Sequence, residues 1–460
     1  MKEQLLKLYK ENKEIINANS PEAVKNLREE AANIFSKNGL PDKNAESWKY
    51  AGIESRLQHE FKFDFNNQSR SLDVDSIFTC DVYDLDTFSV TMLNGWFVYK
   101  NAPITQLEDG TIIGGLSKAF EVYPDLIEEY IGKAAEMESP GLIALNTAFM
   151  QDGLFIYVPD NVEVKKPVQI INIVNSPDDV FLQPRHLIIL GKNSKLTLVH
   201  CDHSLVHNIS FSNTVSEIFV GENAEFENYK VQNMGTNSSL LTNLFIKQQK
   251  NSKVKNNALT LNGGYTKNFV DVRLNGTHCD TNLYGLYLID EKQFADNQVF
   301  VDHAQTDSHS NQLYKGILDD FAKGVFSGKV MVRKDAQKTE AHQNNKNILL
   351  TDDAKINTQP HLEIYADDVK CSHGATVGQL DPDAMFYLHS RGLCEKTARQ
   401  LLMYAFASEV VEKISIPALR DTIDSMVQKR LRGELSVCDQ CLLHCNDKET
   451  AVFNIDMSKI

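Results

Sequence analysis

The sequence predicts a mainly β protein in which a central β-solenoid lies between two helical ends. Short apolar runs separated by polar turns extend from about residue 165 to 370, a loose repeat marks these turns, and helical patterns occur before and after them. No helical stretch of the kind that connects parallel strands in a doubly wound sheet interrupts the central region. With 460 residues, 42% of them hydrophobic and 24% charged, the chain is long enough to bury a large core.

The first 60 residues are predicted to be helical. Ser20 followed by Pro21 is typical of a helix start, apolar residues then recur at helical spacing, and Gly39 is expected to end the helix. The string Glu-Ser-Trp-Lys-Tyr follows at residues 46–50. Its aromatic residues are expected to anchor these helices on the next domain.

The repeat in the central region consists of a polar turn, a small residue and an apolar strand, as in Gly-Lys-Asn-Ser-Lys-Leu. The repeat units begin at Gly191, Gly221, Gln249, Asp319 and Thr351, which lie 30, 28, 70 and 32 residues apart. Such a pattern is typical of the coils of a β-solenoid, and the longest interval is predicted to contain units with degenerate turns. A β-sandwich is the alternative, although a period of this length is long for hairpins.

Two helices are predicted after Pro382. In the first, an apolar stripe is formed by Ala398, Leu401, Leu402, Ala405 and Phe406, followed by Val410. The second begins near Pro417, and its apolar residues are Leu419, Ile423, Met426, Val427 and Leu431. These helices are expected to cap the solenoid, to bind a partner, or to do both.

The overall composition excludes several classes of protein. A formal charge of −15 argues against nucleic acid as a main partner, and no run of 18 apolar residues predicts a membrane span. The start lacks the apolar segment of a secretory signal, and eight cysteines are few for a disulfide scaffold. We therefore expect a cytoplasmic protein with reduced thiols.

Several familiar catalytic motifs are missing from the sequence. There is no Gly-x4-Gly-Lys-Ser/Thr loop, so this chain should not hydrolyse nucleotides by P-loop chemistry. No His-Glu-x-x-His, Gly-x-Ser-x-Gly or Gly-x-Gly-x-x-Gly string occurs either.

Cys371 and His373 are the candidate metal ligands. Residues 362–366 alternate as in a strand, and if the strand continues, the thiol and the imidazole lie on one face. These ligands suit iron, zinc or an iron–sulfur species. Two ligands do not complete a tetrahedral site, so the others would come from elsewhere in the chain or from a partner. The alternative is a structural pair, with a small apolar cysteine and a hydrogen-bonded histidine.

Two other groups of residues resemble metal sites less closely. His303, His309 and His342 would form a ladder if stacked coils brought their nitrogens together; otherwise they are solvated or hydrogen-bonded histidines. A spacing typical of half of a metal site occurs near the C-terminus, at Cys438, Cys441 and Cys445, with His444 adjacent. This segment lacks a second cysteine pair, and a reduced tail is the alternative.

Residues 333–411 and the string at residues 46–50 resemble the SufB/SufD family of the SUF iron–sulfur cluster assembly system. The order His373-Gly374-Ala375, preceded by Lys-Cys-Ser, is similar to the SufD form, whereas SufB carries Glu after the motif histidine. The resemblance implies a right-handed parallel β-helix flanked by helical domains. The domains expected are 1–85 helical, 86–160 mixed and connecting, 161–378 β-helix, and 379–460 helical.

The resemblance also implies a role, partners and a cofactor. The chain would be a non-catalytic subunit that pairs with SufB through the β-helix and binds a separate ATPase, SufC, through its C-terminal helices. Within residues 394–411, the contacts to SufC would be Tyr404, Phe406 and Glu409. His373, with Cys371 beside it, would help to hold iron or a nascent cluster at the interface with SufB.

Several alternatives to this interpretation remain open. The chain could be a SufB-like paralogue, a structural scaffold whose partner holds all ligands, or a polysaccharide-active β-helix enzyme. The missing secretory signal counts against the enzyme. Complexes of the family can carry reduced flavin, but no flavin fingerprint is visible here, and the isolated chain could form a homodimer.

Overall fold

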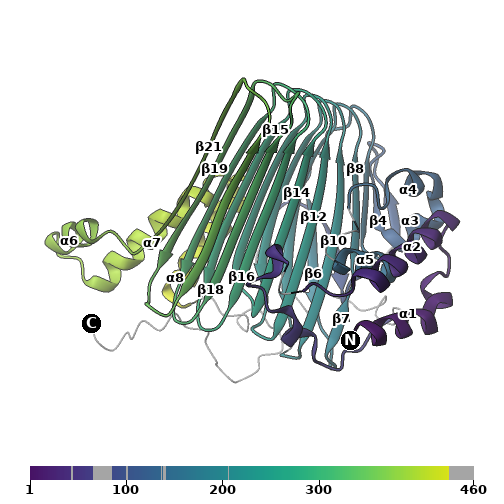
Figure 1. Ribbon diagram of the computed structural model, residues 1–460, viewed down its shortest axis with the longest axis horizontal. Coiled ribbons are helices and arrows are strands. Elements are labelled where there is room, and N and C mark those ends of the chain that lie inside the picture. Colours follow the sequence, from purple (N-terminus) through teal and green to yellow (C-terminus); the bar gives the residue numbers. More distant parts are fainter. Residues whose placement is uncertain are drawn as a thin grey trace.

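The centre of the molecule is a β-solenoid built from two long sheets (Figure 1). The computed structural model describes residues 1–42, 45–65, 85–99, 102–135, 137, 141–205 and 207–434. Within these residues, one sheet has ten strands and the other eleven. Along the solenoid, successive strands alternate between the two sheets, and each strand pairs in parallel with the equivalent strand of the previous coil. The predicted solenoid is therefore confirmed. The β-sandwich alternative is wrong, because a sandwich is built from antiparallel strands.

The ten-stranded sheet is ordered from the N-terminal end of the solenoid to the C-terminal end. Its strands are β2 (Trp96–Val98), β1 (Phe88–Leu93), β6 (Val168–Val174), β9 (Lys195–Ser204), β11 (Glu225–Asn233), β13 (Lys253–Asn262), β15 (Asp280–Ile289), β17 (His309–Leu318), β19 (Thr339–Leu349) and β21 (Val369–Gly378).

The eleven-stranded sheet lies opposite. In the same direction its strands are β3 (Ile104–Gln106), β4 (Ile112–Gly115), β5 (Leu154–Val158), β8 (Arg185–Leu190), β10 (Ser210–Val220), β12 (Ser238–Gln248), β14 (Tyr265–Leu274), β16 (Phe294–His303), β18 (Lys323–Val332) and β20 (Lys355–Ile364), while β7 (Val180–Leu182) pairs with β10. The strands β1 and β5 belong to these two sheets, so the sheets extend into residues 86–160. The sequence predicted that this segment is a mixed connection between domains.

The turns of the solenoid fall into two series, which the sequence repeat had joined into one. Gly191, Gly221 and Gln249 begin turns that lead from the eleven-stranded sheet to the ten-stranded sheet. Asp319 and Thr351 begin turns on the opposite edge, which lead back. The predicted degenerate units are present, because the long interval contains two further turns of the first series, at residues 275–279 and 304–308, whose sequences lack the repeat. The same interval is where the pattern passes from one series of turns to the other.

An asparagine ladder lines the first series of turns. It consists of Asn161, Asn193, Asn223 and Asn251, whose φ angles lie between 53° and 62°. Each side-chain amide donates to the asparagine of the previous coil, at distances of 2.8, 2.8 and 2.9 Å. Asparagine suits this position because it tolerates the left-handed region and can form a hydrogen bond with the next copy of itself.

The interior of the solenoid contains stacked apolar and amide side chains. An apolar cluster of strand residues extends through most of the coils and includes Ile188, Ile218 and Ile246. Amides on neighbouring coils also pair: Asn228 donates to Asn256 at 2.7 Å, and Gln343 donates to Gln312 at 2.9 Å. Some of the interior amides are thus paired between coils.

The N-terminal helices cover the outer face of the eleven-stranded sheet (Figure 1). They are α1 (Lys2–Ile16), α2 (Glu22–Asn38), α3 (Leu116–Val122), α4 (Pro124–Tyr130) and α5 (Gly141–Phe149), with the 3-10 helices η1 (Glu46–Trp48) and η2 (Ile53–Leu57). As predicted, α2 ends at Gly39, whose φ is 66°. The Ser20 hydroxyl does not cap α2 but accepts a hydrogen bond from Arg28. Trp48 is buried with the Lys267 ammonium 4.6 Å from its ring centre, whereas Tyr50 is exposed.

The C-terminal helices α6 (Pro382–Ser390), α7 (Glu395–Val411) and α8 (Pro417–Arg432) follow the last coil. Helices α7 and α8 pack on the outer face of the ten-stranded sheet, and α8 buries all five of its predicted apolar residues. The predicted stripe of α7 is right only at its ends, where Ala398 and Val410 are buried. In between, Leu401 is 45% exposed, and Met403 and Ala407 are buried instead. The helix has apolar residues on more than one face, so periodicity alone could not select the buried one.

None of the helices in the described ranges combines the length and the hydropathy that crossing a membrane requires.

Candidate functional site

The C-terminal end of the solenoid is an open edge. The strands β20 and β21 are the last of their sheets, and each pairs with a strand on one side only. Each is ten residues long, and none of these residues is fully buried. The free edge of such a strand presents backbone N–H and C=O groups that another strand can pair with. Figure 1 shows this edge at the opposite end of the solenoid from the N-terminal helices.

Cys371 and His373 both lie on β21 and, as the strand pattern predicted, share a face. Cys371 is directly opposite Ala341 on β19, and His373 is opposite Gln343. Because Ala341 and Gln343 are buried inside the solenoid, the thiol and the imidazole lie on the inward-facing side of the last coil. The following coil that would cover them is missing from the sheets, so Cys371 is half-buried and His373 is exposed.

The electrostatic environment differs for the two side chains. Burial raises the pKa of the Cys371 thiol, so this group is protonated in the isolated chain at neutral pH. A thiol must lose its proton to bind a metal, whereas a neutral imidazole binds through a free nitrogen. As the chain stands, His373 is therefore the readier ligand.

A complete metal site is not assembled by the described residues. No group of three or more His, Cys, Asp or Glu side chains among them is placed to hold a metal ion. On β20, the last strand of the opposite sheet, the inward-facing residues are Thr358, Pro360 and Leu362, which pair with buried residues of β18. Cys371 and His373 thus form at most half of a tetrahedral site.

The three histidines do not form a ladder, and the alternative of separately hydrogen-bonded or ion-paired histidines holds. His303 lies on β16, in the other sheet, and its Nε2 is 2.8 Å from the Ser310 hydroxyl. His309 is opposite Glu340 rather than His342, and its Nδ1 is 3.4 Å from the Glu340 carboxylate. The imidazoles therefore do not converge, because the register places other residues between them.

The cysteine-rich tail stays a prediction. Cys438, Cys441 and Cys445, together with His444, lie outside the described residues. Of the cysteines in the described part of the chain, Cys201 and Cys279 are buried, and Cys394 is exposed at the start of α7.

Two of the predicted partner contacts on α7 are engaged within the chain itself. The Tyr404 hydroxyl donates to Asp424 on α8 at 2.7 Å, and the Glu409 carboxylate forms an ion pair with Lys315 on β17. The Lys315 ammonium also lies 4.3 Å from the centre of the Phe406 ring. Tyr404 and Glu409 are both half-buried and therefore only partly accessible to a partner.

A different apolar surface on these helices is exposed. Phe386 is 75% exposed, Tyr387 56% and Leu401 45%, and α6 buries none of its residues. Sequence periodicity gave no signal for this surface, because the same residue types serve equally well in a core. Large exposed aromatic residues of this kind mark protein interaction surfaces.

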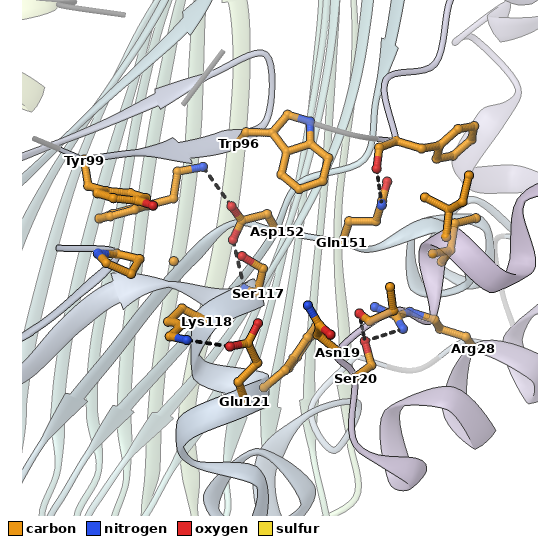
Figure 2. Close-up of a pocket in the computed structure, with 18 residues that line it drawn as sticks. Asn19, Ser20, Arg28, Trp96, Tyr99, Ser117, Lys118, Glu121, Gln151 and Asp152 are labelled. Atoms are coloured by element: carbon orange, nitrogen blue, oxygen red, sulfur yellow. Dashed lines mark hydrogen bonds and ion pairs between the residues drawn. The ribbon is translucent and has the colours of Figure 1, made fainter. Parts of the chain in front are cut away.

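One pocket lies far from Cys371, between the N-terminal helices and the start of the solenoid (Figure 2). Its volume is about 300 Å³. The Asp152 carboxylate in its wall accepts backbone hydrogen bonds from Phe97 and Ser117, and burial raises the pKa of this carboxyl group. Arg28 donates to the Met150 carbonyl at 2.7 Å. These buried groups are already paired with the protein, which favours a structural role for them.

Comparison with known proteins places this geometry in a family. The family model described as SUF system FeS cluster assembly, SufBD core domain, matches residues 172–406, and the model for the SufBD protein N-terminal region matches residues 1–170. The core match includes the last coil and most of α7.

Relatives match along most of the chain. An iron–sulfur cluster assembly SufBD family protein of Synechocystis is 30% identical over 415 residues, covering 88% of this chain and 90% of the relative. The iron–sulfur cluster assembly protein SufD of Escherichia coli is 26% identical over 420 residues, covering 90% and 93%. SufD of Bacillus subtilis is 28% identical over 333 residues, covering 71% and 76%. With both family models matched and a relative 30% identical over 88% of the chain, the chain belongs to the SufBD family of SUF system FeS cluster assembly proteins.

Proposed function

We propose that this chain is a SufD-type, non-catalytic subunit of a scaffold that assembles iron–sulfur clusters, and that its last coil supplies half of the assembly site. The observation that carries the proposal is the position of Cys371 and His373. They are inward-facing ligands on a strand with no following coil, in a chain whose described residues do not complete a site. A second chain that continues the sheet would also supply the missing ligands.

The open edge favours a partner that adds strands. β20 and β21 each offer ten residues of backbone on their unpaired side, and apolar side chains such as Ile364, Tyr365 and Val377 are exposed there. Strand addition satisfies the backbone groups and buries such side chains. We propose a SufB-type subunit as this partner, in line with the SufD names of the relatives.

The cluster is the cargo of this site rather than a resident cofactor. His373 would hold iron or the nascent cluster through an imidazole nitrogen. Cys371 would act as a neighbour that becomes a ligand only when its thiol is deprotonated, because burial raises its pKa. A transient site of this kind needs few ligands from each chain, since the finished cluster must leave.

A separate ATPase subunit of the SufC type is proposed to bind the C-terminal helices. The exposed side chains Phe386, Tyr387 and Leu401 support this placement better than Tyr404 and Glu409, which contact the chain's own residues. The absence of a nucleotide-binding loop from the sequence is consistent with an ATPase on another chain.

The proposal is tested by co-expressing the chain with SufB-type and SufC-type subunits and measuring iron and acid-labile sulfide in the purified complex. The His373→Ala complex should assemble but lose most of its iron and sulfide. The matched control is His361→Ala, which removes an exposed, outward-facing imidazole from β20. Wild-type iron content in the His373→Ala complex would exclude His373 as a ligand, and failure of the wild-type chains to associate would exclude the scaffold itself.

A further inference from the structure

A single file of alternating acidic and basic side chains runs along the outer face of the ten-stranded sheet, at the N-terminal ends of its strands. Each member is directly opposite the next in the register. From the N-terminal end of the solenoid to the C-terminal end, the file consists of Glu163, Lys195, Glu225, Lys253, Asp280, His309, Glu340 and Lys370. Acid and base alternate without a break over all of these strands. The members lie so far apart in sequence that the pattern is visible only once the coils are stacked.

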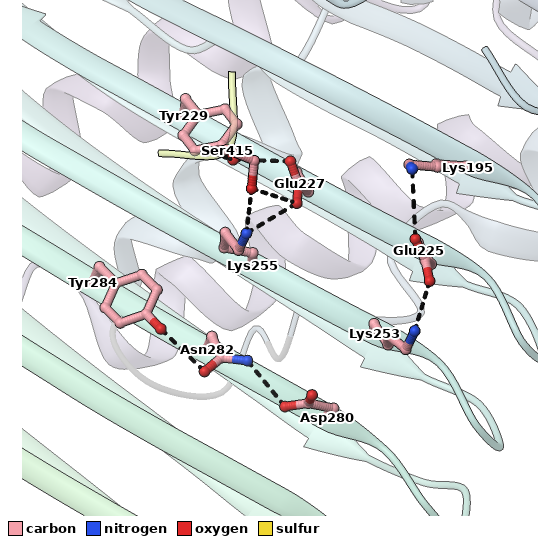
Figure 3. A network of polar contacts seen from close by, with 10 residues as sticks. All are labelled: Lys195, Glu225, Glu227, Tyr229, Lys253, Lys255, Asp280, Asn282, Tyr284 and Ser415. Carbon is pink, nitrogen blue, oxygen red and sulfur yellow. Dashed lines mark hydrogen bonds and ion pairs between the residues drawn. The ribbon is translucent and has the colours of Figure 1, made fainter. Parts of the chain in front are cut away.

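Most neighbours in the file are in contact. The Lys195 ammonium is 3.7 Å from the Glu225 carboxylate, which is 2.8 Å from the Lys253 ammonium (Figure 3). At the other end, the Glu340 carboxylate is 3.4 Å from His309 and 2.9 Å from the Lys370 ammonium. The hydrogen bond from Lys370 lowers the pKa of the Glu340 carboxyl group.

Alternation matters because neighbouring strands lie only about 4.8 Å apart, so two like charges in register repel each other. The equivalent positions on the other sheet show that alternation is not general. There, Lys323 at the start of β18 is directly opposite Lys355 at the start of β20. The alternating file is therefore a feature of the ten-stranded sheet and distinguishes the β21 edge from the β20 edge.

Lys370 is the last member, and it lies on the open edge. Glu340 is its neighbour on one side, and the sheet described here ends at β21 on the other. The side chain of Lys370 is 79% exposed. The next position of the file, on any strand added to this edge, lies beside a lysine and therefore favours a carboxylate.

We propose that Lys370 sets the register of the partner strand by pairing with an Asp or Glu directly opposite it on a different chain. This inference rests on the proposed function, in which the β21 edge pairs with another subunit. A β21 strand from a second copy does not fit, because its outward-facing residues, Lys370, Ser372, Gly374, Thr376 and Gly378, include no carboxylate.

The register has a direct consequence for the assembly site. A slip of one residue turns every partner side chain to the opposite face, and a slip of two moves it by about 7 Å along the strand. Either slip would separate the partner's ligands from His373, which is three positions from Lys370. The ion pair at Lys370 would penalise both slips, and so it would align the two halves of the site.

The test measures the affinity of the purified chain for its SufB-type subunit. Lys370→Glu should weaken binding about tenfold near 0.1 M salt, because attraction becomes repulsion, and Lys370→Met should have an intermediate effect. The matched control is Lys323→Glu, which reverses an exposed charge at the start of β18, a strand already paired on both sides, and should leave binding within about twofold. The difference should vanish near 1 M salt, where charges are screened within about 3 Å.

A charge-reversal scan of the partner's acidic edge residues then identifies the opposite member. One Asp→Lys or Glu→Lys change in the partner should restore binding to Lys370→Glu and to no other variant. Equal binding by Lys370→Glu and Lys323→Glu would overturn the register role while leaving the proposed function intact. If the wild-type chain does not bind at all, the proposed function fails. Self-association of the isolated chain that depends on Lys370 would assign the edge to a second copy and overturn the proposal.

Discussion

Glu409 on α7 and Lys315 on β17 form an ion pair that ties the C-terminal helices to the solenoid. The Lys315 side chain is 4% exposed, and its ammonium also donates to the Phe406 carbonyl at 2.8 Å. Lys346, directly opposite Lys315 on β19, lies 3.9 Å from the same carboxylate. Glu409 is thus the counter-charge for two lysines on adjacent strands, which would otherwise repel each other.

Glu409→Gln should destabilise the chain because it leaves Lys315 without a counter-charge. Since Glu409 is nearly half exposed, solvent screening limits the loss to about 1 kcal/mol in the free energy of unfolding. The hydrogen bond from Lys315 lowers the pKa of Glu409 in the folded chain. The stabilisation is therefore present above the unfolded pKa and is lost as the pH falls through the folded value. Urea unfolding at neutral and acidic pH measures this, and a difference between wild type and variant that persists in acid would contradict it.

Arg430→Met should be far more damaging. Arg430 on α8 donates to both carboxylate oxygens of Asp290 at 2.9 and 2.6 Å, and both side chains are buried. Removing the arginine leaves a buried, unpaired carboxylate, which costs about 3–5 kcal/mol. The exposed Arg432→Met is the control and should change the stability little. Adding Asp290→Leu to Arg430→Met should recover part of the loss, and a further loss would show that the charge is not its cause.

Acid should destabilise the chain through buried histidines. Burial lowers the pKa of His303 to about 4, and it also lowers those of His186 and His200. Because the unfolded chain takes up these protons first, stability falls as the pH drops from the unfolded pKa toward the folded one. For His303 alone this amounts to about 2 kcal/mol by about pH 5. His303→Gln should flatten the pH dependence of the urea midpoint, whereas His309→Gln, at an exposed position, should not.

Phe386→Ser combined with Leu401→Ser should abolish co-purification of a SufC-type ATPase. Both side chains are exposed on the C-terminal helices, so the fold should be unaffected. Tyr404→Phe removes only the hydroxyl that donates to Asp424 and should leave binding unchanged. Circular dichroism confirms folding, and pull-down with the ATPase measures binding. Retention of the ATPase by the double variant would place the contact elsewhere.

The sequence predicted the elements of this fold better than their arrangement. Apolar runs and helix signals identified the solenoid and the helical ends, and strand alternation correctly put Cys371 and His373 on one face. What it could not supply was the stacking of coils. Residues 27–32 positions apart become neighbours only through the register, so the charge file ending at Lys370 and the separation of His309 from His342 were not visible.

The covering of the ten-stranded sheet by α7 and α8 has a consequence for synthesis of the protein. Buried outer-face residues of earlier strands, among them Tyr229, Val231 and Leu259, pack against helices that come more than a hundred residues later in the chain. While the ribosome is still making the last coils, this apolar face has no cover, and nascent chains with such faces are prone to aggregate. Ser415, which donates its backbone N–H to the Tyr229 hydroxyl, can make that contact only after almost all of the described chain has been made (Figure 3). Chains truncated before α7 should therefore need a chaperone to stay in solution, even though every coil of the solenoid is complete.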